Sequence, residues 1–139
     1  MHKNFSHYIK VYYEDTDAGG IVYYANYLKY LERARTEALS VIGLTNLKIK
    51  NDFGALIIVK SCNIEYKKSA YLEDKLIIKS FISSISKTSF FMSQSIFKDQ
   101  ELIVEAKIHL LFINEKAKPI KIPEQILTDF KPYTSEAIS

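Results

Sequence analysis

Cysteine, tryptophan and proline are scarce in this 139-residue chain, which has one cysteine, no tryptophan and three prolines. The single cysteine, Cys62, excludes an internal disulfide and a cysteine-based zinc site, and it favours a reducing compartment. Basic and acidic residues nearly balance, and the formal net charge of +3 is too small to indicate nucleic-acid binding. Long hydrophobic runs are also missing, because the longest, at residues 55–59, is far too short to cross a bilayer.

The N-terminal residues 1–7 lack the apolar stretch and the small-residue cleavage site of a secretory signal peptide. Together with the single cysteine, this predicts a cytoplasmic protein. The length and the composition, 47% hydrophobic and 25% charged, suit one domain over residues 1–139. A curved sheet with one helix would leave an apolar face or edge at this size, so we expect a homo-oligomer.

Apolar periodicity predicts one strand followed by one long helix. The strand is expected at residues 8–13, with Ile9, Val11 and Tyr13 on one face. From residue 24 to residue 42 the period becomes helical, and Gly43 supplies a left-handed stop. Small alanines on the helix would let a sheet approach closely, so the helix is expected to be central. The predicted buried stripe of this helix is Tyr27, Leu31, Ala34, Ala38 and Val41.

Residues 45–54 are less regular, and strand patterns dominate the sequence from residue 55 to residue 113. The expected strands cover residues 55–66, 75–85, 89–97 and 102–113. Short polar turns at residues 86–88 and 98–100 favour an antiparallel sheet. A short helix is expected near residues 124–130, in a tail that three prolines punctuate. This order predicts an α+β fold.

Three acids, Glu14, Asp15 and Asp17, precede the pair Gly19-Gly20 and the start of the long helix. A helix start presents unpaired backbone N–H groups and a partial positive charge, so it can hold an oxyanion beside a carboxylate. Any single acid in such a turn is more often solvated or caps backbone N–H groups. Metal binding is the weaker alternative, because no second acidic cluster offers further oxygen ligands. The glycine loop and the helix start make Asp17 the candidate catalytic acid.

The remaining reactive side chains offer no alternative centre. His2 and His7 lie near the terminus, and His109 lies inside an apolar strand, where a core or hydrogen-bonded histidine is expected. Cys62 has no adjacent histidine or basic pair and is expected to be inert. No serine lies in a nucleophile elbow, and no glycine-rich phosphate loop follows a strand.

Residues 12–28, YYEDTDAGGIVYYANYL, continuing into YLERARTE at residues 30–37, resemble the signature of the hotdog-fold acyl-CoA thioesterases. Within them, the motif is most similar to the 4-hydroxybenzoyl-CoA thioesterase family, in the YbgC-like branch associated with the Tol-Pal system. The resemblance implies a five-stranded antiparallel sheet wrapped around one long central helix. It also implies a homodimer or homotetramer with active sites at the dimer interface.

The activity that the resemblance implies is hydrolysis of an acyl-CoA to a free acid and CoA, without a cofactor or metal. Asp17 matches the family's catalytic carboxylate, either as nucleophile or as general base. The backbone N–H of Tyr24 matches the donor that polarises the thioester carbonyl. Relatives in the YbgC-like branch often carry histidine at this position, and a tyrosine phenol is too weakly acidic to replace it near neutral pH.

Contacts with acyl-CoA are expected from the glycine loop, from the strand at residues 55–66 beside the pantetheine arm, and from a turn. The KTSF sequence of that turn resembles the nucleotide-contacting turn of the hydroxybenzoyl-type enzymes. For each lysine, a solvated surface charge is an equal alternative. The expected contact residues are Gly20, Val22, Ile58, Val59, Lys60 and Lys87.

Two other functions remain open at this point. A hotdog hydratase or dehydratase would need a histidine near the helix start, which this chain lacks. A non-catalytic module that binds acyl-CoA or acyl-carrier protein is supported only by Tyr24. A Tol-Pal link rests on the resemblance alone.

Overall fold

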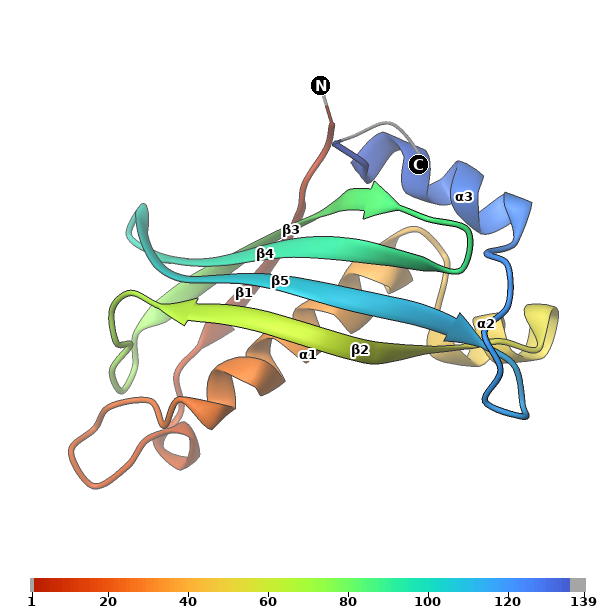
Figure 1. The fold of residues 1–139 in the computed structure, drawn as a ribbon. Helices are drawn as coiled ribbons and strands as arrows, with labels where there is room; N and C mark the ends of the chain where they lie inside the picture. The colour runs from red at the N-terminus through yellow and green to blue at the C-terminus, as the bar shows by residue number, and fades with distance from the viewer. Residues whose placement is uncertain (1, 136–139) are drawn as a thin grey trace.

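The computed structural model of the chain describes residues 2–135. One curved sheet lies over the longest helix, and the two shorter helices lie near the same end of the sheet (Figure 1). The elements are β1 (Phe5–Lys10), η1 (Tyr13–Asp15), α1 (Ala25–Val41), α2 (Asn46–Phe53), β2 (Leu56–Tyr66), β3 (Lys75–Ile85), β4 (Ser89–Lys98), β5 (Glu101–Ile113), α3 (Glu124–Phe130) and η2 (Lys131–Tyr133).

The sheet has five antiparallel strands in the order β1-β3-β4-β5-β2, which confirms the α+β sheet-and-helix prediction. β1 and β2 are therefore the two edges. Strands β2 to β5 lie within about one residue of their expected bounds. The bounds of α3 are those that were expected, residues 124–130. At the tip between β4 and β5, Asp99 and Gln100 both adopt positive φ, as a tight hairpin turn requires.

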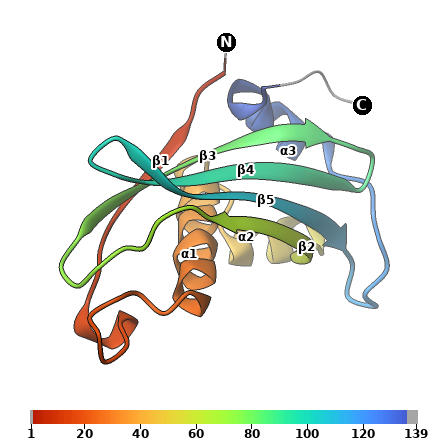
Figure 2. The same cartoon turned by 60° about the vertical axis from the view of Figure 1, so that its left-hand side comes forward.

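The core lies between the concave face of the sheet and α1, and Figure 2 shows the helix running beneath the strands. Alternate residues of β3, β4 and β5 are buried there, which is the period that sequence analysis expected. Ala34 and Ala38 are buried on α1 and allow the close approach. No helix within residues 2–135 is long and apolar enough to span a membrane.

Two expectations about α1 and β1 were wrong in detail. Val41 is 71% exposed, because α1 ends there and the turn at Gly43 brings Leu44 into the core instead. Tyr13 is 82% exposed, since β1 ends at Lys10, opposite the first residue of β3, and has no partner strand beyond it.

The segment expected to be irregular contains the helix α2 (Asn46–Phe53). Thr45 caps its start by accepting a hydrogen bond from the backbone N–H of Lys48 at 3.1 Å. Gly54, with φ of 62°, ends it in the left-handed conformation. Ile49 is the one buried residue of the helix, so its apolar stripe is too short to be recognised by period alone.

Candidate active site

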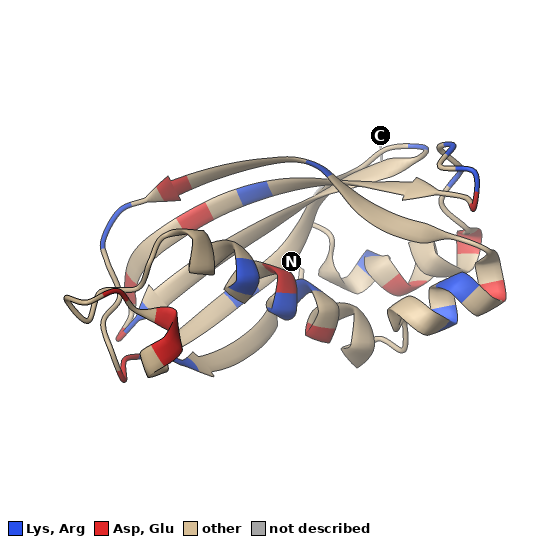
Figure 3. Cartoon of the chain, turned by 90° about the horizontal axis from the view of Figure 1, so that it is seen from below, with Lys and Arg blue, Asp and Glu red and all other residues tan. Residues whose placement is uncertain are grey.

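Asp17 lies in a tight loop that leads from η1 to α1, where the acidic residues of this region gather at one end of the molecule (Figure 3). The loop closes on itself, because the Asp17 N–H donates to the Ile21 carbonyl at 2.9 Å and the Gly20 N–H donates to the Asp17 carbonyl at 3.0 Å. Gly20 adopts φ of 76°, a conformation that favours glycine.

The Asp17 carboxylate uses only one of its oxygens for local structure. Oδ1 accepts hydrogen bonds from the backbone N–H groups of Gly19 at 2.9 Å and Ile21 at 3.3 Å. Oδ2 accepts none from residues 2–135. The capping role that sequence analysis weighed against catalysis is therefore present, and it leaves one carboxylate oxygen free.

Tyr24 is the N-cap residue of α1, and its phenol does not cap the helix. Its backbone N–H has no acceptor within the part of the chain that the structure describes, whereas the neighbouring Tyr23 N–H donates to the Asp15 carbonyl at 3.1 Å. An unbonded amide at a helix start adds to the positive end of the helix dipole. This amide is available to a carbonyl oxygen.

Residues 70–74, which we call the brace segment, hold both the Asp17 loop and the start of α1. The Val22 N–H donates to the Ala70 carbonyl, and the Leu72 N–H donates to the Gly20 carbonyl, each at 2.9 Å. The buried Tyr27 hydroxyl of α1 accepts a hydrogen bond from the Ala70 N–H at 2.8 Å. The loop and the helix are therefore positioned by one and the same segment.

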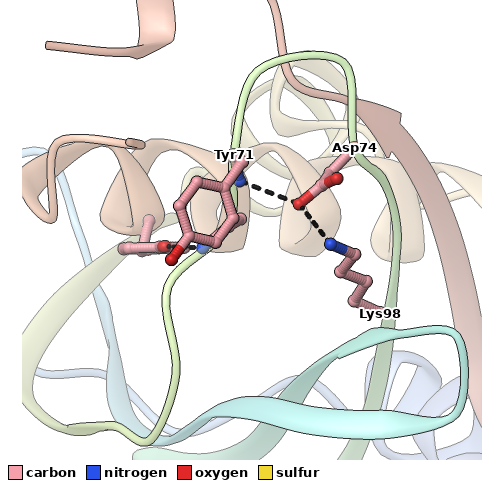
Figure 4. Close-up of polar contacts among 5 residues, drawn as sticks. Tyr71, Asp74 and Lys98 are labelled. Carbon is pink, nitrogen blue, oxygen red and sulfur yellow. Dashed lines mark hydrogen bonds and ion pairs between the residues drawn. The ribbon is translucent and has the colours of Figure 1, made fainter. Parts of the chain in front are cut away.

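A polar cluster in turn ties the brace segment to β4 (Figure 4). One carboxylate oxygen of Asp74 accepts from the Tyr71 N–H at 2.8 Å and contacts the Lys98 ammonium at 3.0 Å. The hydrogen bond to Asp74 raises the pKa of Lys98, and the ammonium also lies 5.7 Å from the centre of the Tyr71 ring. No sequence motif marks this segment, because its partners are distant in the chain.

Asp17 and Tyr24 line one surface pocket of about 480 Å³. Aromatic rings form much of its wall, with Tyr24 stacked on Tyr23 and packed edge-on against Tyr66, whose ring centre is 5.8 Å away. Burial raises the pKa of Tyr66, so this phenol is neutral at physiological pH. The other lining residues are Ile21, Val22, Tyr27, Lys67, Lys68 and Ser69.

The two lysines at this pocket are already paired, Lys67 with Glu65 at 3.3 Å and Lys68 with Glu101. Tyr30 packs edge-on against the lining residue Tyr27, with ring centres 6.0 Å apart; it is fully buried, and its hydroxyl has no hydrogen-bond partner among residues 2–135. Burial, together with the nearby Asp15 carboxylate, raises the pKa of Tyr30. The site is thus rich in neutral phenols.

The expected contact residues fall into two groups. Val22 lines the pocket, and Gly20 lies in the adjoining loop without lining it. Ile58, Val59 and Lys60 lie on the half of β2 that is remote from Tyr66, and Lys87 lies in the β3–β4 turn at that same far end of the sheet (Figure 1). Within one chain, these four residues are not brought to Asp17.

The other residues weighed in the sequence fall outside the pocket. His109 is hydrogen-bonded to the Ser89 hydroxyl at 2.9 Å, as expected, and burial with the nearby Lys60 lowers its pKa. Cys62 is exposed on β2, and partial burial raises the pKa of its thiol. Across residues 2–135, no three histidine, cysteine or acidic side chains gather closely enough to hold a metal ion.

A free carboxylate oxygen and a free amide beside one apolar pocket suit chemistry at a polarised carbonyl. A family model described as the Thioesterase-like superfamily matches residues 11–130. The acyl-CoA thioesterase YbgC of Haemophilus influenzae is 31% identical over 131 residues, which cover 94% of this chain and 96% of that protein. The acyl-CoA thioester hydrolase YbgC of Escherichia coli O6:H1 is 37% identical over 125 residues, which cover 88% of this chain and 92% of that protein.

Among solved structures, a probable thioesterase from Bartonella henselae has a TM-score of 0.83 and 32% identity, covering 87% of this chain and 100% of that one. The arrangement of one sheet around one long helix is thus the hotdog arrangement that the sequence motif implied. The chain belongs to the thioesterase-like superfamily.

Proposed function

We propose that this protein is an acyl-CoA thioesterase, which hydrolyses an acyl-CoA to a free acid and CoA. The observation that carries the proposal is that the Asp17 carboxylate and the unbonded Tyr24 N–H line the same pocket at the start of α1. The similarity to two acyl-CoA thioester hydrolases over most of the chain supports it.

In the proposed reaction the thioester carbonyl oxygen accepts a hydrogen bond from the Tyr24 N–H, which stabilises the negative charge that develops there. Asp17 then acts by one of two routes. As a nucleophile it attacks the carbonyl carbon, CoA leaves as a thiolate, and water hydrolyses the mixed anhydride. As a general base it takes a proton from water, whose oxygen attacks the carbon while the C–S bond breaks. Neither route uses the Tyr24 phenol.

We also propose a homodimer that forms through β2. This edge strand is long and exposed, and it presents apolar side chains at Leu56, Ile58, Val59 and Tyr66. An exposed apolar edge of this kind favours pairing with another strand. Antiparallel pairing about a twofold axis would bring the Ile58 half of one β2 beside the Tyr66 pocket of the partner subunit.

The same pairing would give Lys87 a role in binding the CoA phosphates. The β3–β4 turn that carries Lys87 lies at the Leu56 end of the sheet, between two and three strand spacings, or about 10–14 Å, from β2. An extended CoA reaching out of the pocket of the partner subunit could cover this distance. A reducing, cytoplasmic location fits the exposed free Cys62.

The test of the proposal is thiol release from acyl-CoA by Asp17→Asn protein. The amide oxygen still accepts the loop hydrogen bonds at Oδ1, so the loop is expected to persist while the charged oxygen is lost. We expect the rate to fall by about a hundredfold or more, because removing a charged catalytic group has that order of effect. Asp52→Asn, on the exposed surface of α2, is the matched control and is expected to retain activity.

An unaltered rate in Asp17→Asn protein that folds and binds acyl-CoA would refute the assignment. Hydration of an enoyl-CoA without thiol release would favour the hydratase alternative. Binding of acyl-CoA or acyl-carrier protein with no release over long incubation would favour the binding module that Tyr24 suggests.

A further inference from the structure

A second pocket, of about 140 Å³, lies between α1, the start of α2 and the concave face of the sheet. It shares no residue with the Asp17 pocket. Tyr24 and Arg35 are about 16 Å apart along the helix axis, at 1.5 Å per residue. We call this cavity the Leu39 pocket. Its apolar walls are Leu39, Ile57, Val59, Phe90, Met92 and Leu110, and its polar lining is Glu32, Arg35, Thr36 and Asn46.

Arg35, one of the polar residues that line the Leu39 pocket, is held by a hydrogen-bond network behind it. The Arg35 guanidinium donates from Nη1 to the side-chain oxygen of Gln94 at 3.0 Å. Gln94 is fully buried, and its amide nitrogen donates to the Leu31 carbonyl and to the Ser80 hydroxyl, each at 3.1 Å. An occupant that pushed Arg35 aside would leave the buried side-chain oxygen of Gln94 without the hydrogen bond that it accepts from the guanidinium, which is costly.

The Leu39 pocket reaches β2 at Ile57 and Val59, on the same face of the sheet as Tyr66 of the Asp17 pocket. Ile57, Val59 and Tyr66 all pair with β5 residues that are buried beneath the sheet, namely Phe112, Leu110 and Val104. In the proposed β2 pairing, the Ile57 and Val59 end of one chain lies beside the Tyr66 end of its partner. The Leu39 pocket of one subunit would therefore adjoin the catalytic groups of the other.

We infer that the Leu39 pocket receives the acyl group of the substrate and limits the enzyme to compact acyl groups of about six carbon atoms. The inference rests on the proposed thioesterase function and on pairing through β2. A dry cavity of about 150 Å³ with aliphatic and aromatic walls holds benzene, which has six carbons. Butyryl, hexanoyl and benzoyl groups match this volume, whereas a dodecanoyl chain would have to displace Arg35 from its hydrogen bond with Gln94.

The test compares kcat/KM for acetyl-, butyryl-, hexanoyl-, octanoyl-, dodecanoyl- and benzoyl-CoA. Each buried methylene strengthens apolar binding by about fourfold. We therefore expect kcat/KM to rise from acetyl-CoA to hexanoyl-CoA and to be at least tenfold lower for dodecanoyl-CoA than for hexanoyl-CoA. Leu39→Ala enlarges the pocket and moves the optimum up by about two carbons. Thr36→Phe, at an exposed lining position, fills it and moves the optimum down toward acetyl- and butyryl-CoA.

Two variants outside the pocket serve as controls. Leu44→Ala removes the same side chain from a buried position, and Ser40→Phe adds the same ring to an exposed position on α1. Both are expected to keep the wild-type optimum, whatever they do to stability. Should Leu39→Ala fail to fold, Thr36→Phe still tests the acyl assignment, because it is expected to move the optimum toward shorter acyl groups.

Each outcome bears separately on the two proposals. If the wild type hydrolyses dodecanoyl-CoA as efficiently as hexanoyl-CoA, or if neither pocket variant moves the optimum, the acyl assignment is wrong and the thioesterase proposal stands. If no thioester in the series releases thiol, the proposed function falls, and the acyl assignment falls with it.

Discussion

At the scale of single residues, two tyrosines of α1 differ in one hydrogen bond. Tyr27 and Tyr30 are both buried, at 3% and 1% exposure. The Tyr27 hydroxyl accepts from the Ala70 N–H, whereas the Tyr30 hydroxyl has no partner among residues 2–135. A buried polar group without a partner is costly, so the same chemical change should have opposite consequences at the two positions.

Tyr27→Phe is expected to lower the free energy of unfolding by about 1–3 kcal/mol, because it leaves the buried Ala70 N–H without an acceptor. It should also lower kcat, since Ala70 belongs to the segment that holds both the Asp17 loop and the helix start. Tyr30→Phe is the matched control, and we expect it to be neutral or slightly stabilising. Denaturant unfolding of the two variants checks this, and equal losses in both would contradict it.

The catalytic candidates could be predicted at this scale because they are neighbours in the sequence. Asp17 and Tyr24 lie on either side of one glycine loop, and local backbone chemistry brings them to one pocket. Tyr66 and the brace segment could not be predicted in the same way. Their contacts with the loop depend on how β2 turns into β3, and no local pattern in residues 66–74 specifies that path.

At the scale of elements, β2, β3, β4 and β5 were predicted to within about one residue, whereas β1 was displaced by three residues. β3, β4 and β5 alternate over most of their length between buried and less buried positions, so their apolar period is clear. β1 is an edge strand whose length is set by where β3 begins, which a pattern within β1 cannot show. α2 carried recognisable cap residues, Thr45 and Gly54, but only Ile49 marked its buried face.

The β4 strand also contributes to the site through Lys98, which reaches the brace segment at Asp74. Lys98→Met should loosen that segment and lower kcat with little change in KM. The loss should stay well below the roughly hundredfold that a 1 Å displacement of catalytic groups can cause. Lys98→Arg is expected to restore most of the activity. Lys79→Met is the matched control, because Lys79 also lies over an aromatic ring, Phe97, but makes no ion pair within residues 2–135.

The pH dependence of this ion pair has a definite sign. Asp74 raises the pKa of Lys98 above its ordinary value of 10.5. The stabilisation is therefore fully present below pH 10.5 and is lost as the pH rises through the higher pKa of the folded state. The difference in thermal stability between wild type and Lys98→Met should shrink in strongly alkaline buffer and at high salt. A difference that is constant across both conditions would argue against the ion pair.

At the scale of the whole molecule, the proposed β2 dimer accounts for the position of four predicted contact residues. Ile58, Val59, Lys60 and Lys87 lie at the far end of the sheet from Asp17 in one chain. The family resemblance in the sequence implies active sites that lie between subunits. Their separation from Asp17 is what a site shared across β2 would produce, with the middle of one β2 strand beside the middle of its partner.

Ser61→Lys tests the pairing, because Ser61 is an exposed residue near the middle of β2. In an antiparallel dimer the two introduced lysines would face each other near the twofold axis, where like charges are destabilising. We expect light scattering to show a dimer for the wild type and a monomer for Ser61→Lys, with thiol release lost together with the dimer. Ser6→Lys places the same charge on the opposite edge strand, β1, and should leave both the dimer and the activity intact. A fully active monomer would show that one chain holds a complete site, and it would remove the basis for assigning Ile58, Val59, Lys60 and Lys87 to the substrate.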